Sequence, residues 1–404
     1  MQTEVDFDRF KESYTVNTGA WTKGRNALIA LAVIGWGSSG YGWATDPYNF
    51  HGSYLVNYMF FLTIAWGAAF FVAVQHITSA AWSVTVRRTM ENLMVTVPAL
   101  AALFIPVAAG IPTLYEWGHP GFFDVEHNPA MRFKAIFFSQ PFYISRSVLY
   151  FAVWIVLALA LYRNSTAQDA GPNLQARANL RWWSAPGLLA LMVTVTMASV
   201  DWVMSLDPHW YSTIFGVYVF SGGGLAFIAL VTLICLMLRR AGMLTKSITR
   251  EHYHDLGKWM FALTIWWAYI AFSQYLLIWY ADIPEETSFF KHRFEGSWIY
   301  LSALLLIGHF VIPFLLLLPR AAKRNYTVLA AAAVWILIMH GMDLHWLILP
   351  SVHPGDFHLQ WIDVSTFLAV GSVFSLAFWS RVRRYPMIPV GDLRLREALT
   401  HQNL

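Results

Sequence analysis

Acidic and imidazole side chains interrupt long apolar stretches of this 404-residue chain. A charged side chain at the centre of a bilayer costs about 3 kcal/mol or more, so each such residue is a candidate functional residue. Carboxylates beside imidazoles can accept protons from a bound ligand and pass them on. The candidate proton carriers are His76, Glu91, Asp201, Asp207, His209, His340, Asp343 and His345.

The composition indicates that a lipid bilayer surrounds these residues. Hydrophobic residues make up 57% of the chain and charged residues only 12%, about half the charged share of a soluble domain. A helix needs about 20 mostly apolar residues to cross the hydrocarbon layer. Ten segments meet this requirement: 26–44, 53–82, 88–111, 141–163, 182–205, 210–239, 257–281, 297–318, 325–349 and 362–380.

The distribution of Lys and Arg supports this count. If the ten segments all span, only five of the 27 Lys and Arg residues fall on one side, namely Arg132, Lys134, Arg146, Lys291 and Arg293. Positive residues gather on the cytoplasmic side of membrane proteins, and one miscounted helix would remove the bias. We therefore predict cytoplasmic tails at 1–25 and 381–404 around a membrane domain at 26–380.

The fifth and ninth segments end alike. Asp201 and Asp343 each precede a proline, Pro208 and Pro350, by seven residues, and a Trp follows each Asp closely. The two motifs lie four helices apart, as in membrane folds built from parallel repeats. The sequence therefore predicts an all-α polytopic membrane protein with two four-helix bundles, helices 2–5 (53–205) and helices 6–9 (210–349), flanked by helices 1 and 10.

The candidates form two groups by depth. The outer group contains Asp201, Asp207 and His209 near the end of helix 5 and His340, Asp343 and His345 on helix 9, and His340 and Asp343 share a helix face. Gln274 and Tyr275 on helix 7 lie near the same end of the membrane domain. The alternative is a structural network in which each Asp caps a helix or holds a neighbouring Trp or Tyr.

The inner group is His76 and Glu91, which flank one cytoplasmic turn and could form the mouth of a proton path. The alternative is a local ion pair, since Glu91 follows Arg87 and Arg88 by four and three residues. His309 and His340 could ligate a b-type haem, although an intramembrane histidine more often bonds to a backbone carbonyl or a hydroxyl.

Several kinds of function are excluded. The single cysteine, Cys235, rules out disulfides within the chain, a four-cysteine iron–sulfur cluster and covalent haem attachment. No zinc signature, phosphate-binding loop or dinucleotide fingerprint occurs, and no basic block of the kind that binds nucleic acid is present. We expect no metal site and no electron cofactor held by this chain alone.

Four stretches carry a family resemblance: 199–216, 76–91, 254–257 and 273–286. The first reads SVDWVMSLDPHWYSTIFG, the second begins HITSAAW and contains Arg87, Arg88 and Glu91, and the third reads HDLG. Together they resemble the NrfD/polysulfide-reductase family of membrane subunits. Within that family the chain is most similar to the ActF-type branch of alternative complex III, a quinol-oxidising respiratory or photosynthetic complex. The likeness covers nearly the whole chain.

The resemblance implies a ten-helix subunit in a bacterial cytoplasmic membrane, next to a paralogous ActC-type subunit and other small membrane subunits. It also implies iron–sulfur and multi-haem cytochrome c subunits on the outer face. It further implies quinone, quinol or lipid as the molecules this chain could bind, with Asp201, Gln274, Tyr275 and His340 as candidate quinone-binding residues. We expect a non-autonomous subunit that provides a scaffold and a proton path from His76 and Glu91 to Asp201, His340 and Asp343. The alternatives are the quinol-oxidising subunit itself and a secondary transporter.

Overall fold

The computed structural model describes residues 12–119, 121–123, 131–171, 173–353 and 355–403. Ten helical spans in this part of the chain are long and apolar enough to cross a membrane, as predicted, and none of its residues forms a strand. The spans are α1 (Thr18–Thr45), α2 (Pro47–Thr78), α3–α5 (Val84–Met94, Val97–Ala102, Ile105–Ala109), α8 (Gln140–Ala167), α9 (Leu174–Trp202), α10 (Phe215–Arg240), α11 (Arg250–Ala281), α13–η5–α14 (Trp298–Leu304, Leu305–Val311, Ile312–Leu317), α16 (Tyr326–Val352) and α17 (Trp361–Val382).

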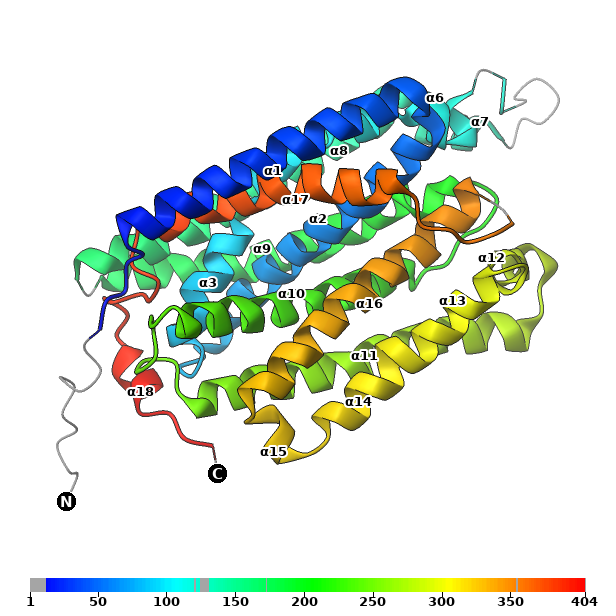
Figure 1. The fold of residues 1–404 in the computed structure, drawn as a ribbon. Helices are drawn as coiled ribbons and strands as arrows, with labels where there is room; N and C mark the ends of the chain where they lie inside the picture. Colours follow the sequence, from blue (N-terminus) through cyan, green and yellow to red (C-terminus); the bar gives the residue numbers. More distant parts are fainter. Residues whose placement is uncertain (1–11, 120, 124–130, 172, 354, 404) are drawn as a thin grey trace.

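Two helical bundles lie side by side (Figure 1). In the first, α2 packs against α3 and α9, and α8 packs against α9 and α4. In the second, α10 packs against α11 and α16, while η5 lies between α11 and α16. The bundles meet where α2 packs along α10 and α16. The predicted bundles of helices 2–5 and 6–9 are therefore present.

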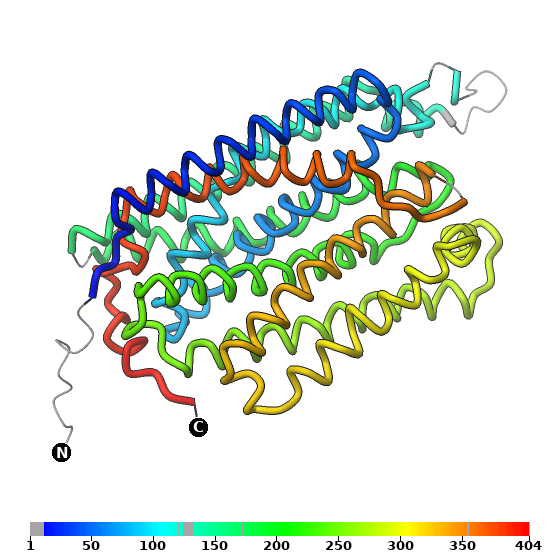
Figure 2. Tube along the Cα trace, viewed as in Figure 1, coloured from blue at the N-terminus to red at the C-terminus, as the bar shows by residue number. Residues whose placement is uncertain are grey.

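The flanking helices α1 and α17 pack along each other, and α17 lies against α2 (Figures 1 and 2). Almost the whole apolar window of α2 is buried inside the protein, whereas α1 is mostly exposed. Helix α1 begins at Thr18, eight residues before the predicted start of the first segment, where the side chain of Asn17 caps it. Residues 1–11 of the predicted tail lie outside the described residues.

Prolines divide the third span. Pro98 and Pro106 stand in the first turns of α4 and α5, where a missing backbone N–H costs least. The same residues would disrupt the interior of one continuous helix, because they remove backbone hydrogen bonds. The third span is therefore a stack of three short helices rather than one rod.

The two ends of the described chain lie on the same side of the protein (Figure 1), which we call the terminal side. Glu12 accepts hydrogen bonds from Ser247, just before α11, and Asn403 bonds to Lys258 and Glu251 in the first turns of α11. Two short helices, α7 (Met131–Phe137) and α12 (Pro284–Phe294), lie on the opposite, distal side. This arrangement follows from an even number of spans. The side that faces the cytoplasm remains the prediction drawn from the charge bias.

The segment after α17 is folded rather than a free tail. Met387 and Ile388 are fully buried, and α18 (Leu395–Leu399) packs against α3. Asp392 pairs with Arg87 in the first bundle, and His401 lies 2.7 Å from Asp255 in the second. The C-terminal segment (383–403) thus fastens the two bundles together on the terminal side.

Acid should loosen this segment. Burial by itself raises the pKa of Asp392, but the Arg87 charge and hydrogen bonds from Arg87 and Arg394 outweigh it and hold the pKa below its usual range. The ion pair therefore stabilises the fold fully above the unfolded-state pKa of about 4, and this stabilisation is lost as the pH falls through the folded value. Hydrogen exchange in 385–403, corrected for its intrinsic pH dependence, should rise over that interval.

The Asp392→Asn variant is the control for this prediction. It should exchange faster at neutral pH and show little further rise on acidification, because the titrating group is gone. The His401–Asp255 pair would remain in this variant and would account for any residual pH dependence. Wild-type protection of the Asn variant at neutral pH would show that the Arg87 contact does not hold the segment.

Candidate functional site

Asp343 is the centre of a buried polar cluster in the second bundle. It lies on α16 with 1% of its surface exposed. The Tyr218 hydroxyl of α10 donates to one carboxylate oxygen at 2.6 Å, and the Trp267 indole of α11 donates to the other at 3.0 Å. Among the described residues, no cationic nitrogen lies within 4.0 Å of this carboxylate. Asp343 is thus hydrogen-bonded by neutral groups but has no counter-charge.

His340 lies one turn earlier on the same face of α16, as its spacing predicts. Its Nε2 shares a 3.0 Å hydrogen bond with the hydroxyl of Thr63 on α2, while its Nδ1 has no partner in the described part of the chain. Gly222 of α10 lies against both residues, and a Cβ there would stand 3.1 Å from His340 Nδ1 and 3.3 Å from Asp343 Oδ2. A glycine at this position lets α10 pack closely over the pair.

His309 completes this cluster from the π-helical segment η5. Its ring is fully buried, its centroid lies 4.0 Å from that of Trp267, and neither ring nitrogen has a hydrogen-bond partner among the described residues. Single π-helical turns often occur at functional sites. The helices that carry His309 and His340 pack together, as predicted, but the indole of Trp267 lies against the His309 ring. We call Asp343, His340, His309, Tyr218 and Trp267 the central cluster.

A second polar site lies between the central cluster and the distal side. His345 Nδ1 bonds to the Gly341 carbonyl at 2.7 Å, and its Nε2 lies 3.7 Å from Asp363 of α17. A pocket of about 10 Å³ borders Asp363 and Trp298, which is room for about one water molecule. We call this pocket, together with His345 and Asp363, the distal pocket. Asp363 was not among the sequence candidates; it stands in the first turn of α17, where an acidic residue commonly caps the helix.

Asp201 has a different environment from Asp343. Arg146 of α8 donates to both of its carboxylate oxygens at 2.9 Å, and the Tyr150 hydroxyl donates at 2.7 Å. The Arg146 guanidinium also donates to the Phe137 carbonyl and lies over the Phe137 ring. Asp201 is thus half of a buried, bidentate ion pair. In the sequence, Arg146 was identified only as one of the five positive residues on the less basic side, and this pairing was not predicted.

The second bundle has a buried arginine near the corresponding place, but it does not reach the aspartate. Arg293 donates to the backbone carbonyls of Trp346 and Leu347 at 2.9 and 2.8 Å. Burial lowers the pKa of Arg293 to about 9, so the guanidinium is still charged at neutral pH. Each bundle thus has a buried arginine near its aspartate motif, but only in the first bundle does the arginine pair with the aspartate.

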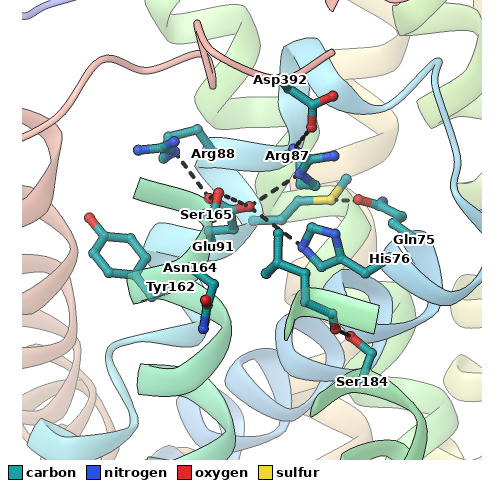
Figure 3. A network of polar contacts seen from close by, with 12 residues as sticks. Gln75, His76, Arg87, Arg88, Glu91, Tyr162, Asn164, Ser165, Ser184 and Asp392 are labelled. Atoms are coloured by element: carbon teal, nitrogen blue, oxygen red, sulfur yellow. Dashed lines mark hydrogen bonds and ion pairs between the residues drawn. The ribbon is translucent and has the colours of Figure 1, made fainter. Parts of the chain in front are cut away.

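The predicted inner group forms a network on the terminal side (Figure 3). Glu91 is fully buried, its carboxylate lies 3.2 Å from Arg87 and 3.0 Å from Arg88, and Ser165 donates to both of its oxygens. Arg88 also pairs with Asp169 at 2.8 Å. The alternative of a local ion pair is therefore confirmed. His76 Nε2 lies 4.0 Å from the same carboxylate, so the structure does bring His76 and Glu91 together.

The remaining candidates are scattered. Asp207 accepts hydrogen bonds from the backbone of His209 and Trp210 and so caps its own turn, and His209 is exposed. Gln274 is buried on α11, while Tyr275 packs on Phe290 and Phe294. Among the described residues, no hydrogen bond, ion pair or ring contact joins the four candidate quinone-binding residues to one another.

The terminal network and the central cluster are separate. His76 and Thr63, the residue that bonds His340, stand on α2 about 20 Å apart along the helix axis. No protein-family model and no curated protein matches this chain.

Proposed function

We propose that this chain is a non-autonomous membrane subunit of a quinol:electron-acceptor oxidoreductase of the alternative complex III type. In this role it provides a scaffold and carries protons through its helix bundles. The proposal rests on the family resemblance of the sequence and on one observation in the structure, the buried Asp343 carboxylate without a counter-charge.

The physical argument is the contrast between the two aspartates. A buried carboxylate costs several kcal/mol unless a cation and hydrogen bonds compensate it. Arg146 compensates Asp201, so that group is suited to a structural role. Asp343 receives only neutral donors. Among the described residues, His340, one turn away, has an unpaired ring nitrogen, and both nitrogens of His309, which packs on Trp267, are unpaired. A buried site without a counter-charge suits a group that gains and loses a proton better than a permanently charged one.

The proposed route has two halves. The terminal half is His76, whose Nε2 lies 4.0 Å from the Glu91 carboxylate that Arg87 and Arg88 neutralise. The distal half runs from Asp343 and His340 through His345 to the distal pocket. The separation of about 20 Å along α2 matters, because a continuous row of proton carriers would let protons leak down their gradient. Transfer between the halves then requires water or a movement of the helices, which the redox chemistry of the complex would drive.

Electron carriers belong to other subunits in this proposal, since one cysteine cannot hold an iron–sulfur cluster or attach haem c. The iron–sulfur and multi-haem cytochrome c subunits would dock on the distal side, and a paralogous ActC-type subunit would lie alongside in the membrane. The quinol site is better placed in that paralogue, because the four candidate quinone-binding residues of this chain do not converge.

Co-purification tests the proposal. The tagged chain, extracted from its native membrane in mild detergent, should bring down proteins with the absorption bands of c-type haem and the paramagnetic signals of reduced iron–sulfur clusters. The preparation should also oxidise a quinol with cytochrome c as acceptor. Purification of the chain alone, together with solute counterflow in liposomes, would identify it as a secondary transporter instead.

A further inference from the structure

A basic pocket lies on the terminal side of the first bundle, between α2, α3, α9 and the C-terminal segment. It encloses about 30 Å³, and its wall includes Arg87, Arg177, Arg181, Arg394 and Asp392. Four guanidinium groups therefore face one carboxylate. We call this site the arginine pocket.

The single carboxylate is already engaged. Asp392 pairs with Arg87, whereas Arg177, Arg181 and Arg394 have no carboxylate within 4.0 Å among the described residues. Arg177 and Arg181 stand four residues apart on α9, an arrangement of like charges that destabilises a helix. Burial and the nearby Arg177 charge lower the pKa of Arg394. An anion in the pocket would relieve this repulsion.

The floor of the pocket is polar and buried. Gln75 and His76 line it with 5% and 7% of their surfaces exposed. In the described part of the chain, Gln75 Oε1 and His76 Nε2 have no hydrogen-bond partner. Figure 3 shows Gln75, His76, Arg87 and Asp392 gathered at this place. Such a lining suits a polar ligand and disfavours an acyl chain.

The position of the pocket relates it to the membrane surface. Arg177 and Arg181 belong to the first two turns of α9, where the span begins. Trp182 next to them is 67% exposed, and aromatic residues of this kind mark the headgroup level. Further along α9, Leu189 and Val193 are also strongly exposed. A headgroup in the pocket would thus continue into an apolar surface that acyl chains can cover.

We propose that the arginine pocket binds the phosphate group of an anionic phospholipid headgroup from the leaflet on the terminal side. Arginine matches phosphate well because its planar fork donates two parallel hydrogen bonds. Basic pockets between transmembrane helices bind anionic headgroups in this way. This inference does not depend on the proposed proton path, because it uses His76 only as a polar wall of the pocket and rests mainly on the guanidinium groups of α9 and the C-terminal segment.

Lipid titration tests the inference. The full-length chain, purified with any subunits that accompany it and stripped of lipid by detergent washing, is titrated with short-chain phosphatidylglycerol and, separately, with phosphatidylcholine. We expect saturable binding of phosphatidylglycerol only. The double variant Arg177→Ala/Arg181→Ala should bind it about tenfold more weakly. Both side chains lie at least partly in solvent, so this variant should fold, and its melting temperature checks this.

A matched control uses two other exposed arginines of the terminal side. Arg250 and Arg320 line a separate open groove in the second bundle, and Arg250→Ala/Arg320→Ala removes the same charge. This control should keep the wild-type affinity. If both double variants weaken lipid binding equally, the effect is general attraction to a basic surface and the proposed site is wrong. Wild-type affinity in Arg177→Ala/Arg181→Ala would also contradict the proposed site. Inorganic phosphate serves as a third arm, since saturable binding of phosphate that displaces the lipid would assign the pocket to free phosphate.

Discussion

The Asp343→Asn variant should lose quinol-driven proton transfer by about a hundredfold while the helix bundles stay folded. An amide cannot carry a proton between donors and acceptors at neutral pH, so the distal half of the route would be cut. The amide oxygen can still accept from Tyr218, and the lost bond from Trp267 costs about 1 kcal/mol. Proton release from the purified complex in liposomes, followed with a pH-sensitive dye, measures the effect.

Tyr218→Phe is the control for this variant. It removes one hydrogen bond to the same carboxylate but leaves the titratable group in place, so stability should fall by a similar amount while proton release persists. If Asp343→Asn releases as many protons per quinol as the wild type, Asp343 is a structural residue and the proposed route is wrong. Co-purification of haem and iron–sulfur subunits would be unaffected by that result, which keeps the two proposals distinguishable.

The Asp201→Asn variant should instead be strongly destabilised, by about 3–5 kcal/mol, because it leaves the buried Arg146 charge uncompensated. The measurement is the loss of helical structure during titration with a denaturing detergent. We expect little intact complex from this variant, so any loss of activity would follow from poor assembly rather than from a broken proton path.

A double-mutant cycle isolates the Arg146–Asp201 pair. Arg146→Gln alone should be about as damaging as Asp201→Asn alone, since each leaves one buried charge, whereas the double variant should cost clearly less than the sum. If Asp201→Asn is as stable as the wild type but loses proton release, Asp201 takes part in proton transfer. The cycle therefore separates a structural aspartate from a functional one.

The two aspartates also show how far sequence reasoning reached at the candidate site. The repeat motif identified both as special, and the i, i+3 spacing correctly placed His340 beside Asp343. Because His76 and Glu91 flank one turn, the sequence correctly predicted that these two residues lie close together. The last two inferences concern residues close in sequence, where helix geometry fixes which side chains are neighbours.

Contacts between distant helices were not accessible in this way. Arg146 and Asp201 lie on different helices 55 positions apart, and nothing in the spacing indicates that one reaches the other. The same holds for the bonds of Tyr218 and Trp267 to Asp343 and for Asp363 beside His345. The four candidate quinone-binding residues stand on α9, α11 and α16, and among the described residues no hydrogen bond, ion pair or ring contact joins them to one another.

The sequence by itself determined the ten spans, the pairing of helices into two bundles and the presence of buried titratable groups. The bilayer makes this possible, because every span must be long, apolar and internally hydrogen-bonded whatever its neighbours are. Only the tertiary structure decided which buried carboxylate has a counter-charge and which does not. That choice depends on how helices rotate and pack against one another, a property of many weak contacts together rather than of any one stretch of residues.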